Sequence, residues 1–382
     1  MVQETGVLPD HEIEALVAEG AIRSDLALEA GQVQPASLDL RLAQDAYRLR
    51  ASFLPGKERT VAEMLQEPGV HMHRIDLTDK GAVLETGCVY LVPLQEHLRL
   101  PAGISARANP KSSTGRIDVF TRLVTNRGRA FDDVPTGYSG PLYLEVSPRT
   151  FPIMVRPGDR LAQVRFKRKR PDALKERVVS IDLEPPEGQP AGYRAKLHSG
   201  VVDLRGIGAH EAGQFWEPVY PRHGRIVLNP EDFYILVSRE TVKVAPMEAA
   251  EMAPIAPELG EFRAHYAGFF DPGFGVNKGG SRAVLEVPLW RQGLQLSGPR
   301  PETVEAFRAL GFAPEPHQVG DGFRQGEVFG RADIVRLAER GAQVLQIEQD
   351  FAGGGIADAA FDPAGADNAL AGCDGPHLMQ AR

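Results

Sequence analysis

An internal repeat constrains the fold of this chain more than any other feature. The segment "VYLVPLQEHLRLP" (Val89–Pro101) aligns without gaps with "FYILVSRETVKVA" (Phe233–Ala245), so that Tyr90 falls on Tyr234. Polar and apolar residues alternate in both copies, which is typical of β-strands. A match of this kind indicates one structural unit that is present twice.

Three further matches accompany the first one. They pair "SLDLR" (37–41) with "VVDLR" (201–205), "GYSGPLYLEV" with "GFGVNKGGSRAVLEV", and "RPGDRLAQ" (156–163) with "RQGEVFGR" (324–331). The second of these places Glu145 opposite Glu286. Because all four matches run in the same order, they predict a duplicated β-domain.

The composition agrees with a mainly β fold. The 382 residues include 30 Pro and 40 Gly, and 7% are aromatic, which favours turns and short strands over long helices. One short helix is expected at "PDHEIEALVAEG" near the N-terminus. We therefore predict a first domain over residues 1–170, a Pro/Gly-rich linker over 171–196, a second domain over 197–350 and a mobile tail over 351–382.

Charge and cysteine content exclude several classes of protein. The net charge of -8 disfavours a nucleic-acid polymer as partner, and two distant cysteines cannot build a disulfide framework or a Cys-x-x-Cys metal site. Neither a signal peptide nor a run of apolar residues long enough to span a membrane is evident, so the cytoplasm is expected. The signatures of zinc deaminases and of P-loop proteins are also missing.

The segment "KSSTGR" combines Lys111 and Arg116 with the small hydroxyls of Ser112 and Ser113. Cationic donors, hydroxyls and backbone N–H groups are what a phosphate-bearing ligand needs. A solvated turn would have a similar composition, so the segment alone leaves both interpretations open.

Glu145 and Glu286 each stand within an apolar strand, "LYLEV" and "AVLEV". A carboxylate among Leu and Val is costly to bury unless it is paired or has a chemical role, and burial raises its pKa towards the range of a general acid/base. An edge-strand Glu that faces solvent is the alternative for either residue. The presence of Glu at the same place in both copies favours a role.

The stretch "HYAGFFDPGFG" predicts a tight Asp-Pro-Gly turn between aromatic rings. A base could stack on Phe274, and Asp271 could accept a hydrogen bond from a sugar hydroxyl. An ordinary hairpin with a hydrophobic flank explains the same residues.

Taken in order, "QPASLDLRL", "VYLVPLQEHLRLPAGISA", "KSSTGR", "GYSGPLYLEV" and "VRPGDRLAQVRF" resemble the dCTP deaminase branch of the trimeric dUTPase superfamily. The first half resembles it over nearly its whole length, and the doubled chain is similar to the long bacterial form. The resemblance implies two tandem dUTPase-like distorted β-barrel (jelly-roll-like) domains with a few short helices.

The resemblance also implies roles for the residues above. The phosphate segment would bind the triphosphate and help to hold the catalytic water, and either Glu286 or Glu145 would be the general acid/base. The hairpin would recognise the nucleoside, and a backbone carbonyl near Ala267 would accept the cytosine amine. The implied catalytic and substrate-binding residues are Glu286, Glu145, Ser112, Arg116, Lys111, Ser113, Ala267, Asp271 and Phe274.

The two copies are unequal, since "APIAPE" replaces "KSSTGR" in the second copy and keeps none of its Ser or Arg residues. In the superfamily, the phosphate segment and the hairpin of one site come from neighbouring subunits. We therefore expect the first half to supply Ser112, Ser113 and Arg116. The second half would supply Ala267, Asp271, Phe274 and Glu286. The alternative, in which Glu145 is catalytic, remains open.

The implied reaction converts dCTP and water to dUTP and ammonia without metal chemistry, and Arg116 would keep the glutamate ionised at rest. Mg²⁺ would accompany the triphosphate, no catalytic zinc is expected, dTTP is a candidate feedback ligand, and the chain would form a homo-oligomer. The alternatives are a dUTPase, which forms dUMP and pyrophosphate, a bifunctional enzyme, and a non-catalytic nucleotide-binding protein.

Overall fold

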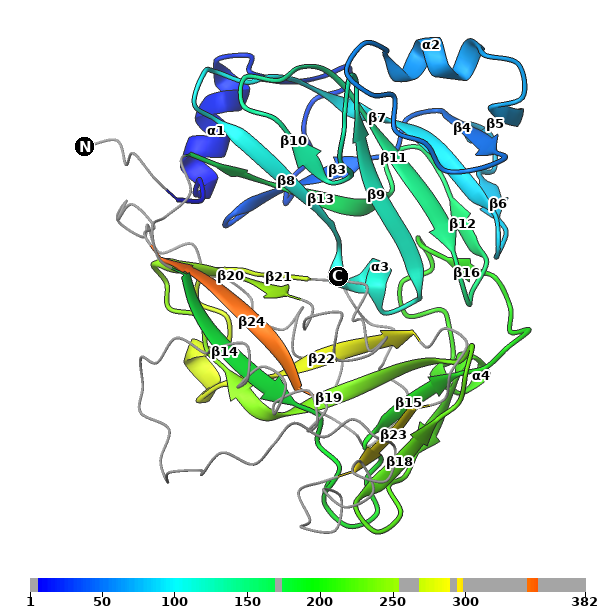
Figure 1. Ribbon diagram of the computed structural model, residues 1–382, viewed down its shortest axis with the longest axis vertical. Coiled ribbons are helices and arrows are strands. Elements are labelled where there is room, and N and C mark those ends of the chain that lie inside the picture. The colour runs from blue at the N-terminus through cyan, green and yellow to red at the C-terminus, as the bar shows by residue number, and fades with distance from the viewer. Residues whose placement is uncertain (1–5, 169–173, 254–267, 289–293, 298–341, 350–382) are drawn as a thin grey trace, which may run out of the picture.

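The computed structural model describes residues 6–168, 174–253, 268–288, 294–297 and 342–349. The described chain consists mainly of β-strands with a few short helices, as expected from its composition (Figure 1). The helices are α1 (Asp10–Ala18), α2 (Val61–Gln66), α3 (Ser112–Gly115), α4 (Ala212–Phe215) and a 3₁₀ turn at Val276–Lys278. None of the helices in these ranges is long and apolar enough to cross a membrane.

The first half is built from three sheets. Its strands are β1 (Ile22–Ser24), β2 (Val33–Gln34), β3 (Ser37–Arg41), β4 (Asp45–Leu49), β5 (His71–Asp76), β6 (Ala82–Leu84), β7 (Val89–Arg99), β8 (Ser105–Pro110), β9 (Val119–Thr125), β10 (Asp133–Val134), β11 (Ser139–Pro148), β12 (Ile153–Val155) and β13 (Arg160–Lys167). One sheet has the order β5-β4-β7-β11-β9 with β1 beside β7, and another has the order β10-β8-β13-β3-β2. The third sheet pairs β6 with β12.

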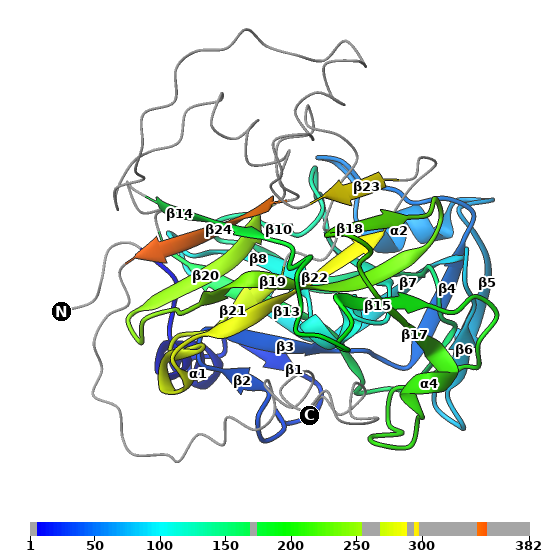
Figure 2. The same cartoon turned by 90° about the horizontal axis from the view of Figure 1, so that it is seen from below.

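The second half contributes the remaining strands. They are β14 (Leu174–Ser180), β15 (Gly192–Ala195), β16 (Val202–Asp203), β17 (Trp216–Val219), β18 (Arg225–Leu228), β19 (Phe233–Val242), β20 (Glu248–Ala253), β21 (Phe269–Phe270), β22 (Ser281–Pro288), β23 (Leu294–Ser297) and β24 (Ala342–Gln349). The sheets have the orders β17-β15-β19-β22 and β14-β24-β20-β21, and β18 pairs with β23. The second half lies below the first in Figure 1, so its strands are in front when the molecule is seen from below (Figure 2).

The sheet that carries each strand glutamate is repeated. The order β5-β4-β7-β11 in the first half corresponds to β17-β15-β19-β22 in the second. Glu145 lies opposite Leu91, and Glu286 lies opposite Ile235. The hydroxyls of the aligned residues Tyr90 and Tyr234 each accept a 3.0 Å hydrogen bond from the backbone N–H five residues earlier in the chain. The aligned strands therefore have the same local structure in both halves.

The second pair of equivalent sheets corrects the sequence alignment. The order β10-β8-β13-β3 corresponds to β21-β20-β24-β14, so β14 takes the place of β3. The backbone N–H of Arg41 donates to Glu96, and that of Ser180 donates in the same way to Glu240. The match of 37–41 with 201–205 is therefore wrong.

The mismatched segments share letters but have different environments. Every residue of β3 is buried, whereas most of 201–205 is partly or fully exposed, and β16 runs parallel to β12 of the first half. The match to 324–331 lies outside the described residues, and the place of β13 is taken by β24. The sequence "AQV" occurs in both β13 and β24.

The segment predicted as a linker, 171–196, contains two strands of the second half. β14 and β15 lie within it, and the Pro/Gly-rich stretch "EPPEGQP" connects them. Proline and glycine at a strand connection give the same composition as an interdomain linker, which explains the prediction.

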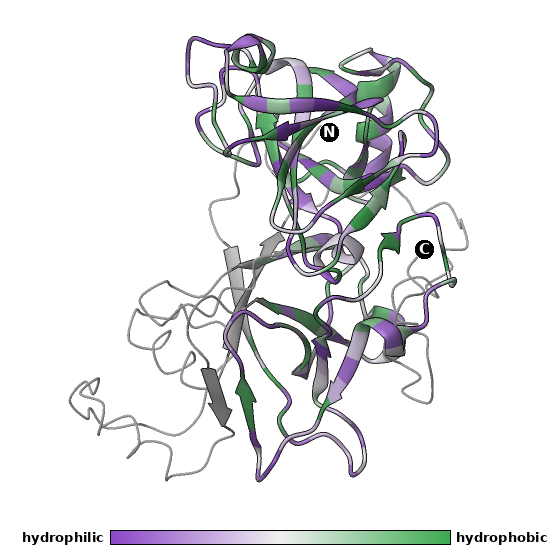
Figure 3. Ribbon diagram, turned by 90° about the vertical axis from the view of Figure 1, so that its right-hand side faces the viewer, coloured by the Kyte–Doolittle hydropathy of each residue, from purple (hydrophilic) through white to green (hydrophobic). Residues whose placement is uncertain are grey.

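A shared core joins the two halves. Phe151 of the first half packs edge-on against Phe215 and Trp216 of the second, with ring centroids 5.6 and 5.4 Å apart. Hydrophobic and hydrophilic residues alternate along many strands (Figure 3), so that one face of these strands packs inward. Because the halves share buried aromatic residues, side chains from both can be held at fixed positions where the halves meet.

Candidate active site

The "KSSTGR" segment forms a single helical turn directly after β8. Lys111 is extended and its carbonyl accepts from the N–H groups of Thr114 and Gly115, while the N–H of Arg116 donates to Ser112. Thr114 and Gly115 are buried beneath the turn, whereas Ser112 is exposed. The small buried residues Thr114 and Gly115 therefore let α3 pack closely against the first half. Ser112 and Ser113 lie in its first turn, and Lys111 and Arg116 flank it.

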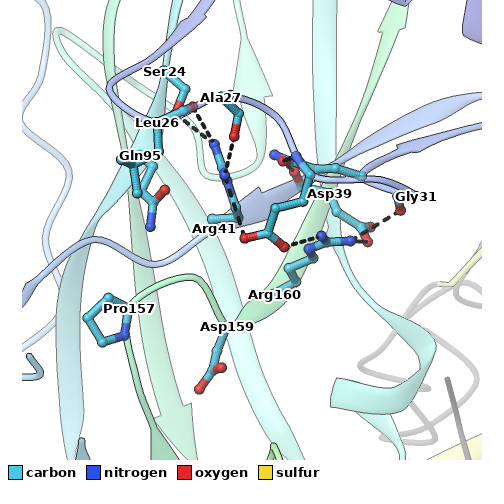
Figure 4. A network of polar contacts seen from close by, with 12 residues as sticks. Ser24, Leu26, Ala27, Gly31, Asp39, Arg41, Gln95, Pro157, Asp159 and Arg160 are labelled. Carbon is cyan, nitrogen blue, oxygen red and sulfur yellow. Dashed lines mark hydrogen bonds and ion pairs between the residues drawn. The ribbon is translucent and has the colours of Figure 1, made fainter.

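Lys111 is held by a buried aspartate. Its Nζ lies 2.5 Å from Oδ2 of Asp39, whose side chain is 2% exposed. Arg160 lies 3.6 Å from the same oxygen and also pairs with Glu29. Figure 4 shows Asp39 and Arg160 beside the buried Arg41, whose guanidinium donates to backbone and side-chain oxygens of the preceding loop. The position of Lys111 is thus fixed by a network rooted in β3.

Arg116 of the first half and Glu286 of the second influence each other's pKa. Glu286 lies on β22 and is 5% exposed. Burial raises its pKa to about 8, although the nearby Arg116 guanidinium opposes this rise. Burial likewise lowers the pKa of Arg116, against the influence of Glu286. The expectation that Arg116 keeps Glu286 ionised at rest is therefore wrong, since desolvation outweighs a single positive charge.

The equivalent glutamate of the first half has a different environment. Oε1 of Glu145 accepts two hydrogen bonds from Arg122, at 2.9 Å from Nε and 2.5 Å from Nη2. The Arg122 guanidinium also lies 3.8 Å from the centroid of Phe131 and donates to Ser52. Glu145 is thus ion-paired with its cross-strand neighbour. No ion pair of Glu286 within 4 Å is found among the described residues, so the two glutamates are not equivalent.

The predicted Asp-Pro-Gly turn begins directly after β21, but it is not a hairpin, because β21 pairs with β20 and the next long strand, β22, pairs with β19. The N–H of Phe274 donates to the carbonyl of Asp271, and Gly273 has a φ of +84°, which a residue with a side chain rarely adopts. The Phe274 ring packs edge-on against Phe270 with centroids 4.9 Å apart. Ala267 lies outside the described residues.

Asp271 faces the first half. Its Oδ1 lies 3.7 Å from Nη2 of Arg165 on β13. Burial raises the pKa of this carboxyl, Arg165 and Lys111 lower it, and Asp39 raises it. The side chain as a whole is 36% exposed, but Oδ1 is closed off from solvent. The pKa of Asp271 thus depends on three charged groups of the other half, of which Arg165 is in contact with it.

The structure brings most of the predicted site residues to the junction of the halves. The positive charge of Lys111 in the first half lowers the pKa of Asp271 in the second. That of Arg116 likewise opposes the rise in the pKa of Glu286. The buried polar atoms here that have no hydrogen-bond partner in the described chain include Arg116 Nε, Asp39 Oδ1 and Asp271 Oδ1. Such atoms are rare in protein interiors, and their unused capacity suits a polar ligand.

Sequence reasoning missed Asp39 and Arg165. Both stand in apolar strand runs, "SLDLRL" and "LAQVRF", and both are almost completely buried. The signal used for the strand glutamates, a charge inside an apolar alternating run, would have found them.

The donors at α3 suit an anion. Cationic groups and hydroxyls bind phosphate oxygens, whereas Mg²⁺ prefers carboxylate, carbonyl and water oxygens. Within the described ranges, no three His, Cys, Asp or Glu side chains gather so that they could hold a metal ion.

Comparison with known proteins gives consistent results along the chain. The N-terminal and C-terminal domain models of 2'-deoxycytidine 5'-triphosphate deaminase match residues 4–170 and 169–292, respectively. A dUMP-forming dCTP deaminase of Leifsonia xyli is 31% identical over 211 residues, which are 54% of this chain and 98% of that protein. A dCTP deaminase of Natronomonas pharaonis is 28% identical over 217 residues, with the same two coverages.

A solved structure is similar over a longer part of the chain. It is the 2'-deoxycytidine 5'-triphosphate deaminase from Agrobacterium tumefaciens, with 49% sequence identity and a TM-score of 0.73. The similarity covers 77% of this chain and 96% of that one. It therefore includes residues of both halves.

Proposed function

The chain belongs to the 2'-deoxycytidine 5'-triphosphate deaminase family, and we propose that it deaminates dCTP at a site formed between its own two halves. The observation that supports this location is that Arg116 from the first half and the buried Glu286 from the second are near enough to influence each other's pKa. A carboxyl with a pKa of about 8 can accept and return a proton near neutral pH.

Glu286 is the proposed general acid/base. It takes a proton from water as the water oxygen bonds to C4 of cytosine and the C4=N3 electrons move to N3, and it passes that proton to N3. It then moves the proton of the new C4 hydroxyl to the amine, so that C4=O forms as the C4–N bond breaks. The products are ammonia and a uracil base. Ser112 and a carbonyl near Ala267 would orient the water, which is a positioning effect, and Arg116 would stabilise the developing charge.

The triphosphate would bind at α3. Lys111, Ser112, Ser113 and Arg116 offer donors to phosphate oxygens, and Asp271 and Phe274 would contact the sugar and the base. The Mg²⁺ expected with the triphosphate would be held by phosphate and water oxygens, because the donors at α3 suit an anion. No step of the proposed chemistry is assigned to the metal, and no zinc is invoked.

Glu145 is not part of the proposed catalytic group, because Arg122 already binds its carboxylate.

We also propose a fold for each half. Each half would be a dUTPase-like distorted barrel, with the division near residue 170, since the strand order of both large sheets is repeated. A homo-oligomer in the cytoplasm, with dTTP as feedback ligand, completes the proposal. Light scattering and dTTP inhibition assays would test the oligomer and the ligand.

A second candidate is a bifunctional enzyme that releases dUMP and pyrophosphate. It is favoured by the name of the Leifsonia xyli relative, a dUMP-forming dCTP deaminase, whereas the Natronomonas pharaonis relative is named dCTP deaminase alone. Incubation of the purified chain with dCTP and Mg²⁺, followed by separation of the products, distinguishes the two. Ammonia with an equal amount of dUTP supports simple deamination, and dUMP with pyrophosphate supports the bifunctional enzyme. Binding of dCTP without any product would reject both.

A further inference from the structure

Among the described residues at the junction of the two halves, Arg165 is the most deeply buried cation. It lies on β13 of the first half, and its side chain is 2% exposed. A buried guanidinium needs hydrogen-bond acceptors or a counter-charge, since its desolvation otherwise costs several kcal/mol. The acceptors that Arg165 contacts therefore indicate which part of the structure it stabilises.

The side chain of Arg165 makes several contacts with the second half. Nη1 donates to the carbonyl of Ala250 on β20 at 3.0 Å, and Nη2 donates to the carbonyl of Phe270 on β21 at 3.3 Å. The guanidinium lies 4.0 Å from the centroid of the Phe269 ring, and its Nη2 lies 3.7 Å from Asp271. One side chain thus contacts β20, β21 and Asp271, the first residue of the turn that follows β21.

We propose that Arg165 is a positioning residue, which sets the place of the Asp271 turn relative to α3 and keeps Asp271 able to accept a hydrogen bond from the nucleotide. The inference rests on the proposed function, because it assigns Asp271 to nucleotide binding. Arg165 itself would not touch the substrate. Its planar fork suits this task better than a lysine, which could not reach two carbonyls at fixed angles.

The charges around Asp271 make the role testable by pH. Arg165 on β13 and Lys111 before α3 favour the ionised carboxylate, whereas burial and Asp39 on β3 oppose it. Without Arg165, the carboxyl would hold its proton to higher pH. Binding of dCTP would then weaken more at pH 6 than at pH 8.

A double-mutant cycle in the full-length chain tests the proposal. Arg165→Met should raise KM for dCTP on the order of 10-fold and change kcat much less, because Glu286 is left in place. In an Asp271→Asn background the same substitution should raise KM by less than about 2-fold. Arg165→Lys should restore part of the affinity in the wild-type background.

The control is Arg205→Met. Arg205 also joins second-half sequence to the first half, through a 2.9 Å contact with Asp159, but its side chain is 53% exposed. Its replacement should leave KM unchanged. If Arg165→Met does not yield folded protein, Arg165→Lys carries the same cycle.

An equal rise in KM in both backgrounds, or a rise that does not depend on pH, would overturn the proposal, because Arg165 would then act on the general fold and not through Asp271. A wild-type chain that released no ammonia from dCTP would reject the proposed function instead. The cycle measured as dCTP affinity by calorimetry would still decide the role of Arg165 in that case.

Discussion

Replacing Glu286 by Gln should stop deamination and at the same time make the protein more stable. The loss of a proton-transferring group lowers turnover by about 10²- to 10⁴-fold. Glutamine keeps the shape of the side chain and cannot ionise. The affinity for dCTP should therefore stay within a few-fold of the wild-type value, as measured by calorimetry.

The gain in stability follows from the pKa of Glu286. This pKa is about 8 in the folded chain, above the ordinary value of 4.5, so the folded state holds the proton more tightly than the unfolded state. Stability is therefore fully present below about pH 4.5 and is lost as the pH rises towards 8. At ~1.36 kcal/mol per pH unit, the loss at pH 7 is roughly 3 kcal/mol, and at pH 5 it is below about 1 kcal/mol. The glutamine variant does not undergo this loss.

Scanning calorimetry of both proteins at pH 5, 6, 7 and 8 measures this effect. The melting temperature of the variant should exceed that of the wild type by an amount that grows with pH. Normal ammonia release by the variant would refute the assignment of Glu286. A melting difference that is constant across this pH range would refute the buried, proton-holding environment on which the assignment depends.

Three further changes test the rest of the site. Arg116→Ala should weaken dCTP binding and turnover together, by at least about 10-fold each, in steady-state kinetics and calorimetry, and unchanged kinetics would remove α3 from the site. Glu145→Gln should leave turnover within about 2-fold but destabilise the fold by roughly 1–3 kcal/mol, because Arg122 loses its counter-charge, and a large loss of ammonia release would make Glu145 the catalytic residue. The value of kcat/KM for dCTP should rise from pH 6 towards pH 8 as Glu286 ionises, and a profile that is flat over this range would contradict that ionisation.

Local patterns in the sequence were enough to predict the parts of the fold that depend on neighbouring residues. Alternation and repetition placed Tyr90 with Tyr234 and Glu145 with Glu286, and the structure gives both pairs the same register. The mainly β class followed from the same patterns. These features are encoded within single strands, where every second side chain faces the same side.

Features that depend on the pairing of distant strands could not be predicted. The place of β14 beside β24 joins segments more than 160 positions apart, and no local pattern shows which strands will be neighbours. The difference between the two glutamates has the same origin. Arg122 lies directly opposite Glu145 on the neighbouring strand, and only the register between β9 and β11 reveals this pairing.

The position of β24 has a consequence for biosynthesis. This strand lies between β14 and β20 (Figure 1), although it is made long after both of them. On a ribosome that adds about 5–20 residues per second, the sheets of the first half can form on the order of ten seconds before β24 emerges. Until then, among the strands that the structure describes, β14 has no partner and β20 has an open edge, and such edges promote association with other chains. A nascent or truncated chain that ends before Ala342 would therefore expose unpaired backbone N–H and C=O groups of β14 and β20, which β24 covers in the folded chain.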